Sequence, residues 1–306
     1  MFGRRPDGRR LDHIDPIVQF MPFIMTQRND AMNQVTQYVD YEPLGNYIKK
    51  RSKVGQRVSF MSLIVAAYVR AVSKYPALNR FIVNKQVFAR NEISIALTVL
   101  RNQGDKENLD EAIVKMAFEP DATVDDVEKQ LNENLKDAVN SEADNETADF
   151  AAKLIRVRPL VQLVVWAAKL LDRYGIMPKF IHRISPFHVS MVITNMASIG
   201  MPAIYHHLYN FGNASIFIAM GKIERQTVYT KDGVKFKNMI PLGIVMDERI
   251  CGGAAYAQGM NYFRKLLENP EELEKKPEVI NYDYDFSKLK ARKKAKEEKK
   301  AKKKQK

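Results

Sequence analysis

The sequence predicts an α+β fold built around one large, mixed or mainly antiparallel sheet. Segments with apolar residues at helical spacing and groups of short, strand-like runs follow one another along the chain. No internal repeat and no linker occurs before residue 287, and 45% hydrophobic residues in a 306-residue chain suffice for a sizeable core. We therefore expect one domain over residues 16–286, between a basic N-terminal arm (residues 1–15) and a Lys-rich, disordered tail (residues 287–306).

The first predicted helix covers residues 59–74. Ser59 is a favourable N-cap, and the small and apolar residues behind it suit a buried helix that ends before Pro76. Four runs rich in β-branched or aromatic residues follow and predict strands at Arg80–Val83, Gln86–Arg90, Ile93–Leu100 and Ala112–Phe118.

Two further helical segments follow these strands. Thr123 caps an amphipathic segment that extends to residue 140. Residues 150–184 predict more helix, with Pro159 in a first turn and Gly175 at a stop. The apolar stripe of this segment favours packing on the protein's own core or on another subunit, and a membrane surface is the alternative.

The last part of the chain returns to strands and closes with a helix. The predicted strands are Val189–Thr194, Ala214–Lys222, Thr227–Thr230 and Val234–Met246, and a Lys-Asp-Gly turn separates the last two. Residues 253–267 carry apolar side chains at helical spacing and predict the final helix.

The positive charge of the chain lies at its two ends. Residues 287–306 carry 12 Lys or Arg against two Glu, and residues 1–10 carry four Arg against one Asp, so residues 11–286 are formally neutral within a total of +13. A folded domain that grips nucleic acid needs positioned cations on its body, which this distribution disfavours. The tail is either a solvated segment or a weak, nonspecific contact for an anionic partner.

The remaining composition limits the cellular setting. Cys251 is the only cysteine, which excludes an intramolecular disulfide framework and a multi-cysteine metal site and fits a reducing, cytoplasmic location. The longest apolar run, residues 160–171, contains Gln162 and Lys169 and is too short to span a bilayer. We expect a protein without a transmembrane segment and without a metal.

Common catalytic signatures are absent from the sequence: no phosphate-binding Gly-Lys-Ser/Thr loop, no Gly-x-Gly-x-x-Gly and no Gly-x-Ser-x-Gly. His206 and His207 are adjacent, so on a helix or strand their rings would point in different directions and make a poor metal pair. His188, three residues after Ser185, is a weaker candidate for a base beside a nucleophile.

The segment from Val245 to Gly253 is the most informative. A long apolar strand ends in three consecutive charged residues, Asp247, Glu248 and Arg249, and an Ala-rich helix follows Gly252 and Gly253. Charges at the end of a buried strand need partners or a solvent-filled site. This arrangement resembles the end of the catalytic domain of the dihydrolipoyl acyltransferases of 2-oxo acid dehydrogenase complexes, where the strand ends in Asp-His-Arg-x-x-Asp-Gly.

Other pieces of the family pattern occur in the same order. The helix and Tyr-Pro-Ala-Leu-Asn turn at residues 60–79 resemble an early helix and its Phe-Pro-x-Leu-Asn turn, and residues 192–196 resemble a Thr-Ile-Ser-Asn-Leu stretch. Residues 93–99 and 215–222 resemble family strands. The resemblance spans roughly residues 20–275 and implies a chloramphenicol acetyltransferase-like two-layer fold that forms trimers with sites between subunits.

The resemblance also implies roles for single residues. In such enzymes the motif histidine takes the proton of a thiol of coenzyme A or dihydrolipoamide, and a hydroxyl stabilises the oxyanion that forms on the acyl carbonyl. Thr194 keeps that hydroxyl, beside Asn195. Asp247 and Arg249 keep the flanking ion-pairing residues, and Gly253 keeps the turn.

The chain departs from the family at the base itself. Glu248 stands in place of the histidine, and Gly252 in place of the motif aspartate. An ordinary glutamate, with a pKa of about 4.3, is a weak acceptor for the proton of a thiol with a pKa of about 8.5, although burial raises the pKa of a carboxylate. Glu248 is therefore either a substituted base or the partner in an intersubunit salt bridge.

These points combine into a functional expectation. We expect a trimeric acyltransferase that uses coenzyme A or an acyl-coenzyme A as substrate, with Glu248 as base and Thr194 as oxyanion donor. The sequence lacks the lipoyl and peripheral-subunit-binding domains of full-length family members, so we expect no covalently attached lipoate. A catalytically inactive family member that binds a ligand or assembles a trimer is the alternative.

Overall fold

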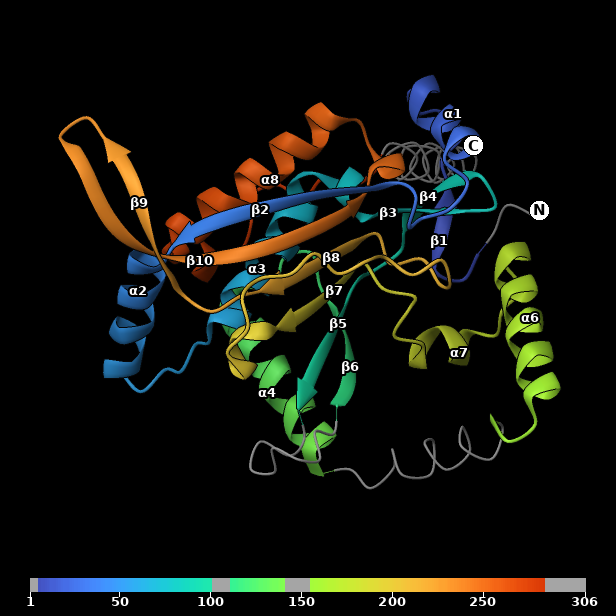
Figure 1. Cartoon of the computed structure of the whole chain (residues 1–306), viewed down its shortest axis with the longest axis horizontal. Coiled ribbons are helices and arrows are strands. Elements are labelled where there is room, and N and C mark those ends of the chain that lie inside the picture. The colour runs from blue at the N-terminus through green and yellow to red at the C-terminus, as the bar shows by residue number, and fades with distance from the viewer. Residues whose placement is uncertain (1–4, 101–110, 141–154, 284–306) are drawn as a thin grey trace, which may run out of the picture.

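The computed structural model describes residues 5–100, 111–140 and 155–283 (Figure 1). The predicted Lys-rich tail, residues 287–306, lies outside the described residues, as does the start of the predicted N-terminal arm. Within the described residues the prediction of an α+β fold with a mixed sheet is confirmed.

The main sheet has seven strands, with β2, β10, β8, β7, β5 and β6 in spatial order and β9 paired to β10. Strands β5, β7 and β8 run parallel, and the other neighbours pair antiparallel. The strands are β2 (Met32–Asp40), β5 (Ile93–Leu100), β6 (Glu111–Phe118), β7 (Met191–Asn195), β8 (Ile216–Met220), β9 (Glu224–Thr230) and β10 (Gly233–Asp247). A smaller antiparallel sheet contains β1 (Gly8–Arg10), β4 (Gln86–Arg90) and β3 (Arg80–Val83), in that order.

Helices cover one face of the main sheet and enclose the main core (Figure 1). Ser59 accepts a hydrogen bond from the N–H of Ser62 and caps the almost wholly buried helix α3, as predicted. These helices are α2 (Tyr41–Lys53), α3 (Phe60–Lys74), α4 (Val124–Asn140) and α8 (Gly253–Glu268). The sheet and its helix layer form the two layers that the resemblance implies.

The opposite face of the sheet is covered by an irregular segment instead of helices. Leu208 and Ala214 of this segment pack with Val192, Phe217 and Val245 in a second apolar cluster. A side chain at Gly243 of β10 would meet the carbonyl oxygen of Ile204 at 2.2 Å, so only glycine allows the segment to cross the strand this closely.

Two helices lie apart from this core. Helix α6 (Arg158–Tyr174) ends at Gly175, which has a φ of 71°, so the predicted stop is confirmed; α7 (Lys179–Ile184) follows. Among the described residues the apolar stripe of α6 does not pack on the protein's own core, because only Asp172 of α6 is buried; the other predicted partners, another subunit or a membrane surface, stay predictions. No described helix is long and apolar enough to cross a membrane.

Residues 11–58 contain elements that the sequence did not reveal. Helix α1 (Pro16–Ile24) and strand β2 lie here, and β2 pairs with the whole second half of β10. Part of the predicted basic arm is also built into the fold, because β1 pairs with β4 and the Arg5 side chain is buried in an ion pair with Asp172.

Candidate functional site

The motif turn, which we define as residues 247–253, begins at the last residue of β10. Asp247, the last residue of β10, is fully buried, and its carboxylate accepts hydrogen bonds from Nε and Nη2 of Arg249 at 2.8 and 2.7 Å. It also accepts the backbone N–H of Arg249 at 3.1 Å, which closes the short 3-10 turn Glu248–Ile250. A bidentate, charge-assisted pair of this kind fixes the geometry of the turn.

Arg28 is a second buried cation beside this pair. Its Nε lies 3.6 Å from Asp247 Oδ2, and its Nη1 and Nη2 donate to the carbonyl oxygens of Tyr209 at 2.7 Å and Ile82 at 3.2 Å. Burial lowers the pKa of Arg28 to about 10, although the charge of Asp247 opposes this shift. The expectation that charges at this strand end need partners is thus met inside the chain for Asp247 and Arg249.

Glu248 differs from both of its neighbours. Its backbone N–H donates to the carbonyl oxygen of Ala31 at 2.9 Å, and its side chain is only partly buried. Its carboxylate makes no hydrogen bond or ion pair with any residue that the structure describes. The backbone of Glu248 is therefore fixed by the turn, while its carboxylate has no partner among the described residues.

The glycines of the motif lead directly into α8. Gly252 is the N-cap of the helix, offers no side-chain cap, and is exposed together with Gly253. Gly252 supplies no carboxylate where the family motif has an aspartate, and the turn contains the Asp247–Arg249 ion pair described above. Cys251 is buried, and burial raises the pKa of its thiol to about 11, which makes it a poor nucleophile at neutral pH.

Thr194 and Asn195 lie at the other end of the sheet. Asn195 ends β7, and its side chain accepts the N–H of Ser198 at 3.3 Å to cap the next turn. Thr194 is level with Gly243 on β10, five residues before Glu248. At about 3.3 Å per residue this gives roughly 17 Å along the strands, plus two strand spacings of about 5 Å across the sheet. One chain does not bring Thr194 and Glu248 together.

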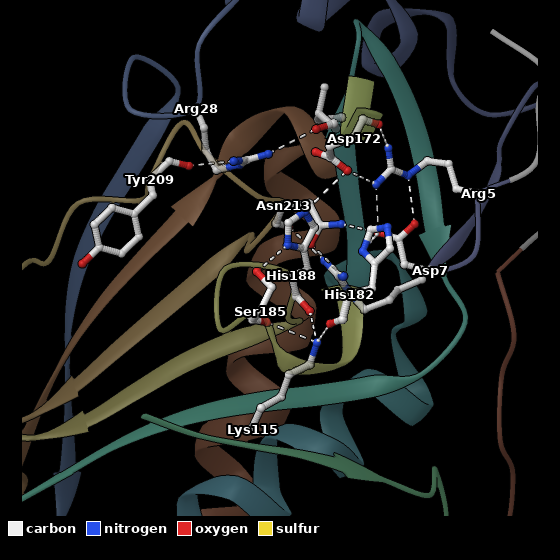
Figure 2. A network of polar contacts seen from close by, with 12 residues as sticks. Arg5, Asp7, Arg28, Lys115, Asp172, His182, Ser185, His188, Tyr209 and Asn213 are labelled. Atoms are coloured by element: carbon white, nitrogen blue, oxygen red, sulfur yellow. Dashed lines mark hydrogen bonds and ion pairs between the residues drawn. The ribbon is translucent and has the colours of Figure 1, made fainter. Parts of the chain in front are cut away.

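A second polar cluster lies at the start of β7, and sequence reasoning found only part of it (Figure 2). Ser185 Oγ lies 2.7 Å from His188 Nδ1, and His188 Nε2 lies 3.4 Å from Asp172 Oδ1 on α6. Arg5 binds Asp172 at 2.5 Å and Asp7 at 2.9 Å. The sequence analysis missed Asp172; the one signal that could have identified it is that it is the single acidic residue of the stretch 155–184.

The contacts of this cluster indicate a structural role. A pocket of about 420 Å³ beside it is lined by His182 and His188, but Ser185 is not among the described residues that line it. Lys115 Nζ donates to the carbonyl oxygens of Ser185 and His188, and burial lowers its pKa to about 8. Ser185 is buried, so its hydroxyl is not placed to attack a substrate. The contacts of the cluster instead join residues 5–7, α6 and α7 to the start of β7.

The adjacent histidines lie outside the helices and strands, where the expectation that their rings diverge does not apply. His206 and His207 stack with ring centroids 5.0 Å apart, because they lie in the irregular segment and not on a helix or strand. His206 also stacks on Phe217, with centroids 4.2 Å apart. Within the described ranges, no group of three or more His, Cys, Asp or Glu is placed to hold a metal ion.

A family model matches the later part of the chain. Residues 188–274 match the model described as 2-oxoacid dehydrogenases acyltransferase (catalytic domain). The stretch includes β7, β8, the motif turn and α8, and over these residues it confirms the resemblance seen in the sequence. A search of curated proteins gave no match.

Solved structures confirm the fold over most of the chain. A probable dihydrolipoamide acetyltransferase from Listeria monocytogenes has a TM-score of 0.52 at 12% identity, over 85% of this chain and 94% of the other. The cubic core of a pyruvate dehydrogenase multienzyme complex gives 0.51 at 14%, over 86% and 94%. The dihydrolipoamide acetyltransferase of Azotobacter vinelandii, studied for the catalytic role of a serine, a histidine and an asparagine, gives the same values.

Proposed function

We propose that this protein is an acyltransferase that takes its acyl group from an acyl-coenzyme A or a related thioester, with Glu248 as the general base. The observation that carries the proposal is the motif turn: Asp247 and Arg249 satisfy each other in the interior and leave the carboxylate of Glu248 partly exposed. Polar groups kept free at a rigid, charged turn are typical of active sites.

The proposed chemistry requires only a base and an oxyanion donor. Glu248 takes the proton of the attacking thiol, and the resulting thiolate adds to the acyl carbonyl. The carbonyl electron pair moves onto oxygen, where the hydroxyl of Thr194 donates a hydrogen bond. Collapse of this intermediate expels the first thiolate, which recovers the proton from Glu248.

A complete site of this kind needs two subunits. Glu248 and Thr194 lie at opposite ends of the sheet in one chain, so we infer a homotrimer in which each site takes one residue from each of two neighbours. Helix α1 supports this assembly, because it packs beside the motif turn and exposes the apolar residues Ile17, Phe20, Phe23 and Ile24. An exposed apolar stripe next to an incomplete site fits a subunit interface.

An inactive family member is the second candidate, and two positions favour it. In the Azotobacter vinelandii enzyme the histidine and the asparagine under study are four positions apart. The residues four apart in this chain are Glu248 and Gly252, which are a weaker base and a residue without a side chain. In this case the trimer would bind a thioester or a partner without turnover.

The remaining partners follow from the same proposal. Coenzyme A or an acyl-coenzyme A is the substrate, and we propose no lipoate on this chain and no metal. The Lys-rich residues 287–306 would add a weak, nonspecific attraction to anionic partners. A cytoplasmic location fits the single buried cysteine, which needs no oxidising compartment.

The experiment is single-turnover thiol release from acetyl-, propionyl- and longer acyl-coenzyme A with a panel of small acceptors, for the native protein and for Glu248→Gln. We expect acceptor-dependent release that falls at least about tenfold in the variant, because the amide cannot accept the proton. Glu278→Gln, at an exposed residue near the end of the described chain, is the matched control. Coenzyme A binding without release in either protein would favour the inactive candidate.

A further inference from the structure

Helix α6 carries an apolar stripe that faces away from the body of the protein. Leu163, Trp166 and Leu170 are 58%, 60% and 37% exposed. At 3.6 residues per turn these three lie on one side of the helix, and the buried Asp172 lies on the opposite side. The helix is thus oriented with its charged contact inward and its large apolar side chains outward.

Helix α7, the next helix along the chain, carries two more exposed apolar side chains. Phe180 and Ile184 lie one turn apart on α7 and are 63% and 70% exposed. Figure 1 shows α6 at one edge of the molecule with α7 between it and the sheet. An exposed apolar surface of this extent marks an interaction site.

The exposed charged residues of the segment 155–184 are all positive. The segment 155–184 contains six Lys or Arg residues, and every one of them is exposed. Its single acidic residue, Asp172, is buried and paired with Arg5. Exposed apolar and aromatic residues interspersed with cations, without exposed carboxylates, match the surface of an anionic lipid bilayer.

We propose that this surface, the α6–α7 face, docks peripherally on anionic lipid membranes. The face consists of Leu163, Trp166, Leu170, Phe180 and Ile184 with the cations Arg156, Arg158, Lys169, Arg173, Lys179 and Arg183. The apolar residues enter the boundary between headgroups and acyl chains, where tryptophan is favoured, and the cations bind lipid phosphates.

Charge complementarity favours the lipid over a two-fold contact with a second copy of the chain. A two-fold contact between two α6–α7 faces would set the same six cations of each copy close together. Like charges at an interface oppose association, and the face has no exposed carboxylate to balance them.

Polar contacts at the end of α6 hold the face in place. Asp172 binds Arg5, and Arg173 Nε donates to Asn84 Oδ1 at 3.0 Å, so the last turn of α6 is fixed to the N-terminal segment and to the β3–β4 turn. The orientation of the stripe follows from these contacts and does not depend on the acyl-transfer chemistry.

Trp166 provides the test, because it is the only tryptophan of the chain. The full chain is mixed with vesicles of phosphatidylglycerol and phosphatidylcholine, or of phosphatidylcholine alone, and Trp166 emission is recorded with and without brominated lipid. We expect a shift to shorter wavelength and quenching by brominated lipid with the anionic vesicles only, weakening as salt screens the cations. Glu248→Gln should bind vesicles like the native protein.

Matched variants make the test specific. Phe180→Gln is compared with Phe236→Gln on the β9–β10 hairpin, since the two side chains are 63% and 62% exposed. Lys179→Glu is compared with Lys231→Glu, another exposed lysine. Phe180→Gln and Lys179→Glu should each weaken vesicle binding about tenfold, which corresponds to about 1.4 kcal/mol, and the two hairpin variants should not.

Two outcomes would overturn the proposal. Vesicle binding that is lost on truncation at Ser287 but unaffected by Phe180→Gln would assign the attraction to the Lys-rich tail. Emission of Trp166 that is already shielded from acrylamide without vesicles would show that the face is covered by the chain itself or by a second copy, and sedimentation of the same sample separates these two cases.

Discussion

The motif turn and the α6–α7 face arrange charge and apolar surface in opposite ways. At the motif turn Asp247, Arg249 and Arg28 are buried together, and the side chain left partly exposed is Glu248. On α6 one carboxylate is buried and the apolar side chains are exposed. A polar group held at the surface by buried ion pairs suits chemistry, whereas an apolar stripe held outward by one buried ion pair suits docking.

The comparison predicts the largest effect for Asp247→Ala. This substitution leaves two buried guanidinium groups, Arg249 and Arg28, without their carboxylate and should lower the free energy of unfolding by about 3–5 kcal/mol. Urea unfolding measures the change. Asp232→Ala, which removes an exposed pair with Lys235, should change it by less than about 0.5 kcal/mol. Equal midpoints for both variants would contradict the importance of the buried pair.

His182, on α7, should make the free energy of unfolding depend on pH. Burial, with the nearby charges of His188 and Arg5, lowers the pKa of His182 to about 4, whereas an unfolded histidine has a pKa of about 6.5. The unfolded chain therefore binds the proton first, so stability present above pH 6.5 is lost towards pH 4, on the order of 3 kcal/mol.

Urea unfolding at several pH values tests this dependence with His182→Gln and with His13→Gln, at an exposed histidine, as control. The His182 variant should lose the slope between pH 6.5 and 4, and the control should keep it. The lowered pKa values of Asp7 and Asp172 act below about pH 4, since burial there is outweighed by Arg5 and the histidines. An unchanged slope in His182→Gln would refute the assignment.

Asp172→Asn should release α6 at moderate cost. The amide keeps the shape of the side chain but weakens the charge-assisted hydrogen bond to Arg5, worth about 2 kcal/mol. Limited proteolysis should then cut within residues 155–184 faster than in the native protein. Asp12→Asn, in an exposed pair with Arg10, is the control. A digestion rate equal to that of the control would show that Asp172 does not hold the helix.

Leu163→Ala should have the smallest effect. Because Leu163 is 58% exposed, its truncation should change the free energy of unfolding by less than about 0.5 kcal/mol. Leu242→Ala, at a fully buried residue of β10, should cost about 2–5 kcal/mol in the same urea titration. A large loss for Leu163→Ala would mean that α6 is packed and that the contrast between the two regions does not hold.

The elements with strong local signals were predictable. The Ser59 cap, the stop at Gly175 and the alternating strands gave α3, the end of α6 and most of the sheet close to their observed bounds. Strand β2 was missed because its exposed, polar residues such as Asn33 and Gln34 resemble a loop. Its pairing with β10 comes from long-range contacts that no local pattern contains.

The candidate site was predictable in part for the same reason. The sequence predicted that the three charged residues at the end of β10 need partners, and the structure shows that Asp247 and Arg249 pair with each other. The pairs Arg28–Asp247 and Arg5–Asp172 each join residues more than 150 positions apart in the chain, so neither pair could be found from spacing. The separation of Thr194 from Glu248 follows only from the strand register.

Intersubunit complementation tests the central claim most directly. Glu248→Gln and Thr194→Ala are each expected to be nearly inactive as pure proteins. Unfolded together in equal amounts and refolded, they should regain about a quarter of the native turnover, because that share of sites in random trimers combines an intact Glu248 with an intact neighbouring Thr194. A mixture as inactive as either variant, with trimers present and native mixtures refolding to full activity, would contradict a site shared between subunits.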